Sequence, residues 1–397
     1  MKRNKGITLV ALIITIVVML ILVAVSVNVL IKSNLIGTAE KTVGKYKTAS
    51  EEEAKGGTIT IEGKEYDSIE DYLKGKEKLP NIEAGERAEA NFNYKGVTIP
   101  KGFTVSGIED EQSVDGGLVI YDIPEGKTVD WTNPDSVKTA YNQFVWIPVE
   151  VTSSDTETNI AAFRKSKWIA NAETGGERTT GLSEEHTEPY SYDANDYDAS
   201  TGIKTQIANL IKSIYKYGGF YIGRYEAGSE TVRTKSSGTT VLGIKQDMYP
   251  YTYVIWGDSM ENIGTTGAVY LSNNLYNTET YGATSMLCTG ACWESMLEFI
   301  KDSSHDVIDS TAWGNYKDAS SFEVNRGAYA VLDTSNSTLG NFNNVENTYS
   351  KTEDIAILLT TGATERNSAK NIYDVAGNCY EWTTESYSSN ERIVRGR

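Results

Sequence analysis

The chain has 397 residues, of which 39% are hydrophobic and 23% charged, a composition that fits one large folded domain or two modest ones. Its 37 lysines and arginines against 54 aspartates and glutamates give a formal net charge of −17, which disfavours nucleic acid as a partner because phosphates would be repelled. Three cysteines and two histidines exclude a disulfide framework and a multi-histidine metal centre within one chain.

The first segment is a short basic tail followed by a long apolar run. Lys2, Arg3 and Lys5 precede residues 7–31, which carry no charge. As a helix this run would be about 37 Å long, enough to span the hydrocarbon core of a bilayer. The basic residues lie on its N-terminal side, which predicts a cytoplasmic tail and export of the rest of the chain. A simple N-terminal membrane anchor is one interpretation.

The sequence Lys-Gly-Ile-Thr-Leu that opens the apolar run resembles the leader of type IV pilins and pseudopilins. In that family a prepilin peptidase cuts after the glycine. The resemblance therefore implies a leader over residues 1–6, cleavage between Gly6 and Ile7, and a transmembrane or filament helix over residues 7–31. It also implies other pilin subunits as partners in a pilus-like filament. Ala11 stands where pilins usually carry a glutamate that pairs with a neighbouring subunit, and this departure leaves filament assembly open.

Residues 32–90 are polar and have the character of a stalk. Residues 58–61 alternate like a short strand, and residues 62–64 have the composition of its turn, so we expect a small hairpin within the stalk. A change in character near residue 90 predicts a domain boundary there.

The remainder, residues 91–397, alternates short β-rich runs with few helical patterns. Glycine, proline and asparagine bound the runs, and apolar residues at helical spacing predict two amphipathic helices. Few helices, many short strands and long loops indicate an α+β domain. The expected strands are 97–100, 117–120 and 144–149, and the expected helices are 203–214 and 293–300.

A second resemblance lies near the C-terminus. Residues 374–382 follow the pattern Asp-x-x-Gly-Asn-x-aromatic-Glu-Trp and precede Arg-Ile-Val-Arg-Gly at residues 392–396. Together they resemble the signature of formylglycine-generating-enzyme-like domains. Residues 144–149, 219–226 and 289–300 are similar to that family's early strands and its Trp-Glu helix, in the same order.

This second resemblance implies an elaborated C-type lectin-like fold over residues 91–397. The family continues beyond an Arg-Gly-Gly segment, whereas this sequence ends at Arg395-Gly396-Arg397. We therefore expect the last strands of that fold to be missing.

The resemblance also implies a structural calcium ion at the signature. Its ligands would be the side chain of Asp374, the carbonyls of Gly377 and Cys379, and the carboxylate of Glu381. Carboxylate and carbonyl oxygens are the ligands that a hard cation selects. The alternative is a metal-free loop in which Glu381 only accepts backbone donors.

The family's enzymes carry their catalytic cysteines after the Arg-Gly-Gly segment. Cys288 and Cys292 lie too early to replace them, so we expect no enzymatic activity. The sequence favours a bacterial protein at the cell membrane and surface whose lectin-like head binds an unknown extracellular ligand. By family analogy, such a head is a target of retroelement diversification. Two alternatives remain: a formylglycine-generating-type oxidoreductase completed by another chain, and a structural minor pilin without a ligand.

Overall fold

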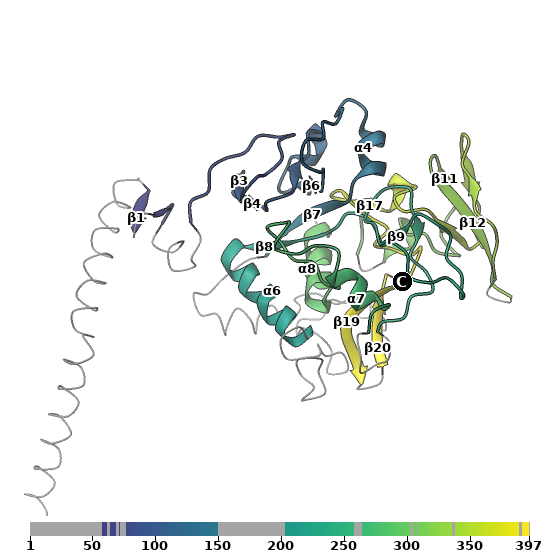
Figure 1. Cartoon of the computed structure of the whole chain (residues 1–397). Coiled ribbons are helices and arrows are strands. Elements are labelled where there is room, and N and C mark those ends of the chain that lie inside the picture. The colour runs from purple at the N-terminus through teal and green to yellow at the C-terminus, as the bar shows by residue number, and fades with distance from the viewer. Residues whose placement is uncertain are drawn as a thin grey trace, which may run out of the picture. The chain divides into compact units, whose positions relative to one another are not determined.

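The computed structural model describes ten segments of the chain, which form two compact units, Met1–Lys78 and Leu79–Arg397 (Figure 1). The described residues are 58–61, 64–68, 71, 77–149, 203–257, 264–301, 305–307, 309–335, 338–388 and 391–396. The apolar run at 7–31, with Gly6 and Ile7, lies outside them. Among the described residues, no helix is both long and apolar enough to cross a membrane.

The division between the units falls at residue 78, earlier than the boundary near residue 90 that we expected. The difference has a physical cause, because residues 79–90 bond to the larger unit. The amide of Ile82 donates to the Asn93 carbonyl at 3.0 Å, and that of Ala88 donates to the Phe103 carbonyl at 2.8 Å. Ile82 and Ala88 are both buried in the apolar core of this unit.

In the smaller unit the expected hairpin is present. Strand β1 (Ile59–Ile61) pairs antiparallel with β2 (Lys64–Tyr66), with Ile59 opposite Tyr66.

The larger unit is built on a four-stranded antiparallel sheet in the order β5-β6-β7-β8. Around it lie four helices and several two-stranded hairpins among the described residues, which makes a mixed α+β domain with few helices. The sheet strands are β5 (Thr104–Val105), β6 (Val119–Tyr121), β7 (Gln143–Pro148) and β8 (Gly219–Gly223), and the helices are α4 (Pro134–Ala140), α6 (Ile203–Tyr217), α7 (Ala268–Asn273) and α8 (Gly290–Ile300).

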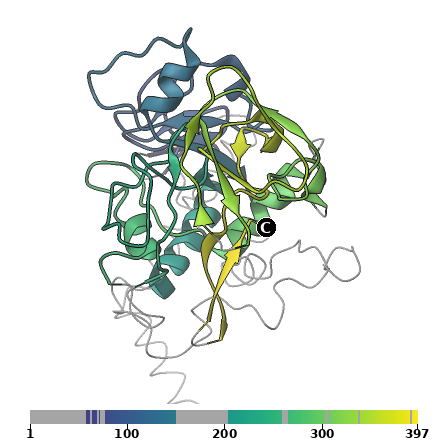
Figure 2. The same ribbon diagram turned by 90° about the vertical axis from the view of Figure 1, so that its right-hand side faces the viewer.

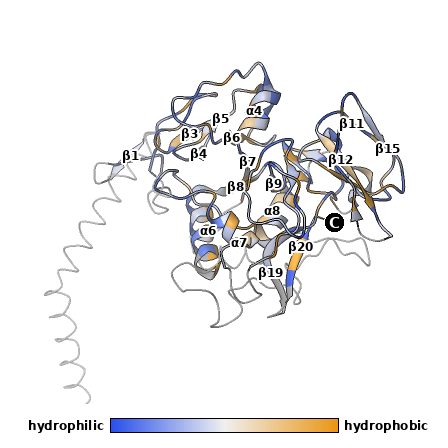
Figure 3. Cartoon of the chain, turned by 45° about the vertical axis from the view of Figure 1, so that its right-hand side comes forward, coloured by the Kyte–Doolittle hydropathy of each residue, from blue (hydrophilic) through white to orange (hydrophobic). Residues whose placement is uncertain are grey.

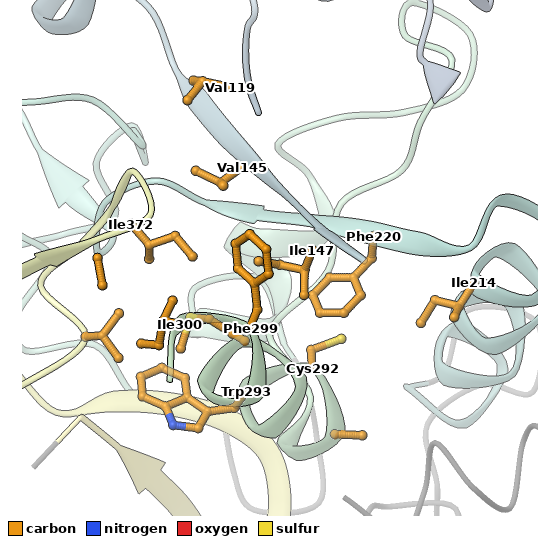
Figure 4. Packing of buried hydrophobic residues seen from close by; sticks show 14 of the residues in the cluster. Val119, Val145, Ile147, Ile214, Phe220, Cys292, Trp293, Phe299, Ile300 and Ile372 are labelled. Atoms are coloured by element: carbon orange, nitrogen blue, oxygen red, sulfur yellow. The ribbon is translucent and has the colours of Figure 1, made fainter. Parts of the chain in front are cut away.

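The central sheet is buried on both faces, because successive side chains of a strand point to opposite sides. Val145 and Ile147 of β7 pack on one face against α6 and α8, as Figure 4 shows. Trp146, between them, packs on the other face with hairpin β3 (Phe92–Tyr94) and β4 (Val97–Ile99). The helices at 203–214 and 293–300 that the sequence predicted are therefore confirmed as core-facing elements.

A third, smaller core belongs to residues 319–363 and is seen as the lime-green lobe of Figure 1. Its central strand β12 (Ala328–Asp333) pairs with β16 (Ile357–Leu359) on one side, and with β13 (Thr338–Leu339) and β14 (Asn343–Asn344) on the other. In a separate two-stranded sheet, β11 (Phe322–Val324) pairs antiparallel with β15 (Tyr349–Lys351). These strands have only two to six residues, so their pairing depends on the surrounding packing.

A buried ion pair joins distant parts of the larger unit. Arg224, directly after β8, lies 2.6 Å from a carboxylate oxygen of Glu111, and both side chains are at most 2% exposed. Lys138 of α4 lies 3.4 Å from the same oxygen. The second terminal nitrogen of the Arg224 guanidinium, Nη2, donates to the side-chain oxygen of Asn371 at 3.3 Å. The 3₁₀-helix η1 (Glu109–Glu111), the sheet and the C-terminal region are thereby connected.

The last described element is the hairpin of β19 (Glu381–Ser388) and β20 (Glu391–Arg395), which both Figures 1 and 2 show in yellow extending from the rest of the unit. Figure 3 shows hydrophilic and hydrophobic stretches side by side along β20. The guanidinium of Arg395 forms a bidentate ion pair with the fully buried carboxylate of Glu385, with hydrogen bonds of 2.8 and 2.9 Å. It also lies 3.0 Å from the carboxylate of Glu294 in α8. These ion pairs hold the hairpin on the helix.

Candidate functional site

The signature turn follows β18 (Ile372–Tyr373), which pairs with β17 (Ser368–Ala369). The amide of Tyr373 donates to the Arg224 carbonyl at 2.8 Å, which places the turn beside the end of β8. Asp374, Gly377 and Asn378 all have positive φ, so this short segment reverses direction sharply. The turn therefore connects the central sheet to the C-terminal hairpin.

Gly377 is required by the geometry of the turn. Its φ is +78°, and a side chain on it would collide with the backbone of Asn315. Its amide donates to the Gly396 carbonyl at 2.7 Å, which ties the turn to the end of β20. The glycine thus satisfies a conformational and a steric condition together.

We expect Gly377→Ala to lower the free energy of unfolding by at least about 2 kcal/mol, because it adds left-handed backbone strain and a steric clash. Gly96→Ala is a matched control, since Gly96 has φ +85° and no atom within 4 Å of an added side chain. Equilibrium urea unfolding of the full chain measures both. If both variants lose the same free energy of unfolding, the backbone of Asn315 does not pack closely against Gly377.

The side chain of Asn378 forms hydrogen bonds with three separate segments of the chain. Its oxygen accepts from the Leu359 amide at 2.8 Å and from the Asn315 side chain at 2.9 Å. Its nitrogen donates to the Leu359 carbonyl at 3.2 Å and to Glu226. Asn378 therefore fixes the position of the Glu226 carboxylate, 152 residues earlier in the chain.

Asp374 is buried and its carboxylate is already occupied by amide donors. One oxygen accepts from the Gly362 amide at 2.8 Å and the other from the Asn367 side chain at 3.2 Å. Burial raises the pKa of Asp374 to about 7, although these two hydrogen bonds act in the opposite direction. Its contacts are those of a residue that stabilises the turn.

Glu226 and Glu381 each keep one buried oxygen, Oε2, without a hydrogen-bond partner in the described part of the chain. Burial raises the pKa of both carboxyls well above the usual range, and the charge of Asp374 raises both further. Negative charge held this close together must be neutralised by protons or by a bound cation. The carboxyls of Glu226, Asp374 and Glu381 thus form a buried acidic cluster. Within it, Glu226 and Glu381 each have one oxygen that lacks a hydrogen-bond donor among the described residues.

The expected calcium ligands are brought together only in part. A side-chain carbon placed on Gly396 would lie 2.7 Å from Glu381 Oε2 and 3.0 Å from the Cys379 carbonyl, so these two oxygens converge. The oxygens of Asp374 are instead directed to Gly362 and Asn367. No group of three or more metal-ligating side chains occurs among the described residues. Calcium at this turn therefore remains a prediction of the resemblance alone.

Glu226 is the site residue that the sequence did not reveal. From the sequence, residues 219–226 are similar only to an early strand of the resembling family and carry no site role. The available signal was an acidic residue directly after a Gly-Arg-Tyr sequence, but its partner Asn378 is too distant in the chain for any local pattern to join them.

The three cysteines, Cys288, Cys292 and Cys379, are all free thiols. Burial raises the pKa of the Cys379 thiol well above its usual value, and the charges of Glu226, Glu381 and Asp374 raise it further. That thiol therefore stays protonated and unreactive at neutral pH.

A cavity of about 1060 Å³ opens beside the cluster. Its wall contains many aromatic side chains, and hydroxyl and amide side chains from α6 and α7 add polar groups. The wall includes Glu226, Ala227, Tyr253, Asn273, Tyr380, Glu381 and Trp382. A cavity of this size and composition is typical of a binding site for an organic ligand.

No protein-family model, no curated protein and no solved structure matches this chain. Both resemblances seen in the sequence, at residues 5–9 and at residues 374–382, therefore stand as predictions on the residues that carry them.

Proposed function

We propose that the chain is a membrane-tethered, surface-exposed binding protein whose larger unit holds an extracellular ligand in the aromatic cavity. The cavity is the observation that carries the proposal, because its volume and the mixture of aromatic and polar side chains on its wall are features of a ligand site. Export and tethering rest on the basic tail and the apolar run at residues 7–31. We propose binding without catalysis.

We further propose that the larger unit has the elaborated C-type lectin-like arrangement implied by residues 374–382. Three segments of that resemblance lie in contact. The turn bonds to Arg224 and Glu226, and the hairpin that follows it bonds through Arg395 to Glu294 of α8. Contact of these segments supports the proposal.

A thermal-shift screen of sugars, peptides, amines and aromatic compounds on the full chain tests the binding function. We expect at least one class to raise the melting temperature by mass action. Ala227→Trp should remove the shift, because Ala227 is exposed and lies on the cavity wall. Val241→Trp, at a residue 78% exposed outside the cavity wall, is the matched control. A shift that survives Ala227→Trp would place binding elsewhere.

The pilin-like leader makes a separate prediction. Cleavage between Gly6 and Ile7 removes Lys2, Arg3 and Lys5 and changes the formal charge from −17 to −20. Intact-mass analysis of the protein from its native membrane should therefore show a mature chain that begins at Ile7. A dominant species that retains residues 1–6 would contradict the pilin-like leader and favour the simple anchor.

A further inference from the structure

A second cavity, of about 240 Å³, lies at the small lobe that Figure 1 shows in lime green. Its wall is formed by residues of β11 and the turn after it, and by the segment that leads into the 3₁₀-helix η4 (Glu365–Asn367). It shares no wall residue with the aromatic cavity. At about 30 Å³ for each water molecule it has room for about eight of them, so it suits a small ligand.

Arg366, on this wall, has no carboxylate partner in the described part of the chain. Its Nη2 donates to the Ser320 hydroxyl at 3.1 Å and to the Thr311 carbonyl at 3.5 Å. Nε and Nη1 have no acceptor among the described residues, and of these two atoms only Nε is buried. Nη1 therefore presents N–H donors that are both accessible and unpaired.

A second cation lies near the same aromatic ring as Arg366. The guanidinium carbon of Arg366 lies 4.9 Å from the centre of the Phe322 ring, and Nζ of Lys351 lies 5.6 Å from it. Lys351 is fully buried and donates to two backbone carbonyls, but it forms no ion pair with a carboxylate among the described residues. Burial lowers the pKa of Lys351 and the charge of Arg366 lowers it further, although three nearby acids act in the opposite direction. An anion in the cavity would relieve the repulsion between the two cations.

Two carboxylates on the wall limit the charge that such an anion can carry. Both oxygens of Glu365 are engaged, since Oε1 lies 2.9 Å from Arg326 Nη2 and Oε2 accepts from the Tyr373 hydroxyl at 2.6 Å. Glu323 is exposed on β11 and forms no ion pair among the described residues. These two carboxylates would repel a doubly charged phosphate more strongly than a singly charged carboxylate.

We propose that this cavity binds the carboxylate of a small organic acid. The guanidinium of Arg366 donates to the carboxylate, because arginine recognises carboxylates through charge-assisted hydrogen bonds. Arg326 adds a second positive charge to the wall, and its Nε and Nη1 have no acceptor among the described residues. Phe322 and Ala363 give the wall an apolar side that suits the carbon chain of the acid.

Isothermal titration of the full chain at low ionic strength with butyrate and with butyramide tests the proposal, because the two probes differ in charge and hardly in size. We expect heat of binding from butyrate only, and weaker binding of inorganic phosphate. N-acetylglycine, which mimics the C-terminal carboxylate of a peptide, is titrated alongside butyrate. Tighter binding of N-acetylglycine identifies a peptide terminus as the source of the carboxylate, and tighter binding of butyrate identifies a free acid.

Arg366→Met should weaken butyrate binding about tenfold or more, because charge-assisted hydrogen bonds to the carboxylate are lost. Lys317→Met removes the same charge from a nearby exposed residue outside the wall and should leave binding unchanged. Asn325→Trp should also remove binding, because Asn325 is exposed on the wall and the larger side chain fills the cavity. Its matched control is Asn341→Trp, at an exposed residue outside the wall. Asn325→Trp decides the question if Arg366→Met does not fold.

Equal binding of butyrate and butyramide, or tighter binding of phosphate than of butyrate, would overturn the proposal. So would butyrate binding that is unchanged in Asn325→Trp or in folded Arg366→Met. Ala227→Trp should leave butyrate binding intact, because Ala227 lies on the aromatic cavity and not on this one. Loss of butyrate binding in that variant would place the anion in the aromatic cavity, so the two sites succeed or fail separately.

Discussion

Arg395→Met should lower the free energy of unfolding by about 3–5 kcal/mol, because it leaves two buried carboxylates without their cation. Glu385 is fully buried and Glu294 is 1% exposed, and both lie within 3.0 Å of the guanidinium. Equilibrium urea unfolding of the full chain measures the loss.

Arg326→Met is the matched control for Arg395. Arg326 forms an ion pair with Glu365 at 2.9 Å, but the two side chains are 35% and 58% exposed, so its loss should be under about 1 kcal/mol. Adding Glu294→Gln and Glu385→Gln to Arg395→Met should recover much of the lost stability. Equal losses in the two arginine variants would show that the hairpin is not held by Arg395.

Arg224→Met should be of similar effect, about 3–5 kcal/mol, because it leaves Glu111 buried with only Lys138 nearby. The double variant Arg224→Met/Glu111→Leu should be more stable than the single one, since the unpaired carboxylate is gone. If the double variant is no better, the loss comes from the hydrogen bonds of Arg224 to Tyr121, Gln143 and Asn371.

The same pair predicts a pH dependence. Burial alone would raise the pKa of Glu111, but the Arg224 guanidinium, the hydrogen bonds from Ser106 and Tyr121 and the charge of Lys138 together hold it below its ordinary 4.5. A lowered folded-state pKa contributes stability that is present above pH 4.5 and lost as the pH falls through the folded-state value. Glu111→Gln should therefore lose less stability than wild type between pH 5 and pH 3 in urea unfolding, and an identical acid loss would contradict the pairing.

The features that the sequence predicted best are those with a local physical signal. The β-rich run at residues 144–149 predicted a strand, and the apolar spacing at residues 203–214 and 293–300 predicted helices, and the structure contains all three. Each of these depends on side chains within a few turns of the chain.

The features that were missed depend on contacts between distant segments. Glu226 becomes a site residue only through its contact with Asn378, and the two oxygens of Asp374 accept hydrogen bonds from Gly362 and Asn367. The small lobe at residues 319–363 has strands of a few residues, whose pairing no local pattern specifies. The start of the larger unit at residue 79 follows from backbone bonds to later strands.

The contacts of Arg224 have a consequence for the order of folding. Its guanidinium bonds to Glu111, 113 residues earlier, and to Asn371, 147 residues later. Contacts of such high sequence separation close large loops, so domains rich in them fold slowly and late. The buried charges find their partners only after the C-terminal region is present. The larger unit should therefore gain its stability in one late cooperative step, and an N-terminal fragment that ends before Asn371 should remain only loosely ordered.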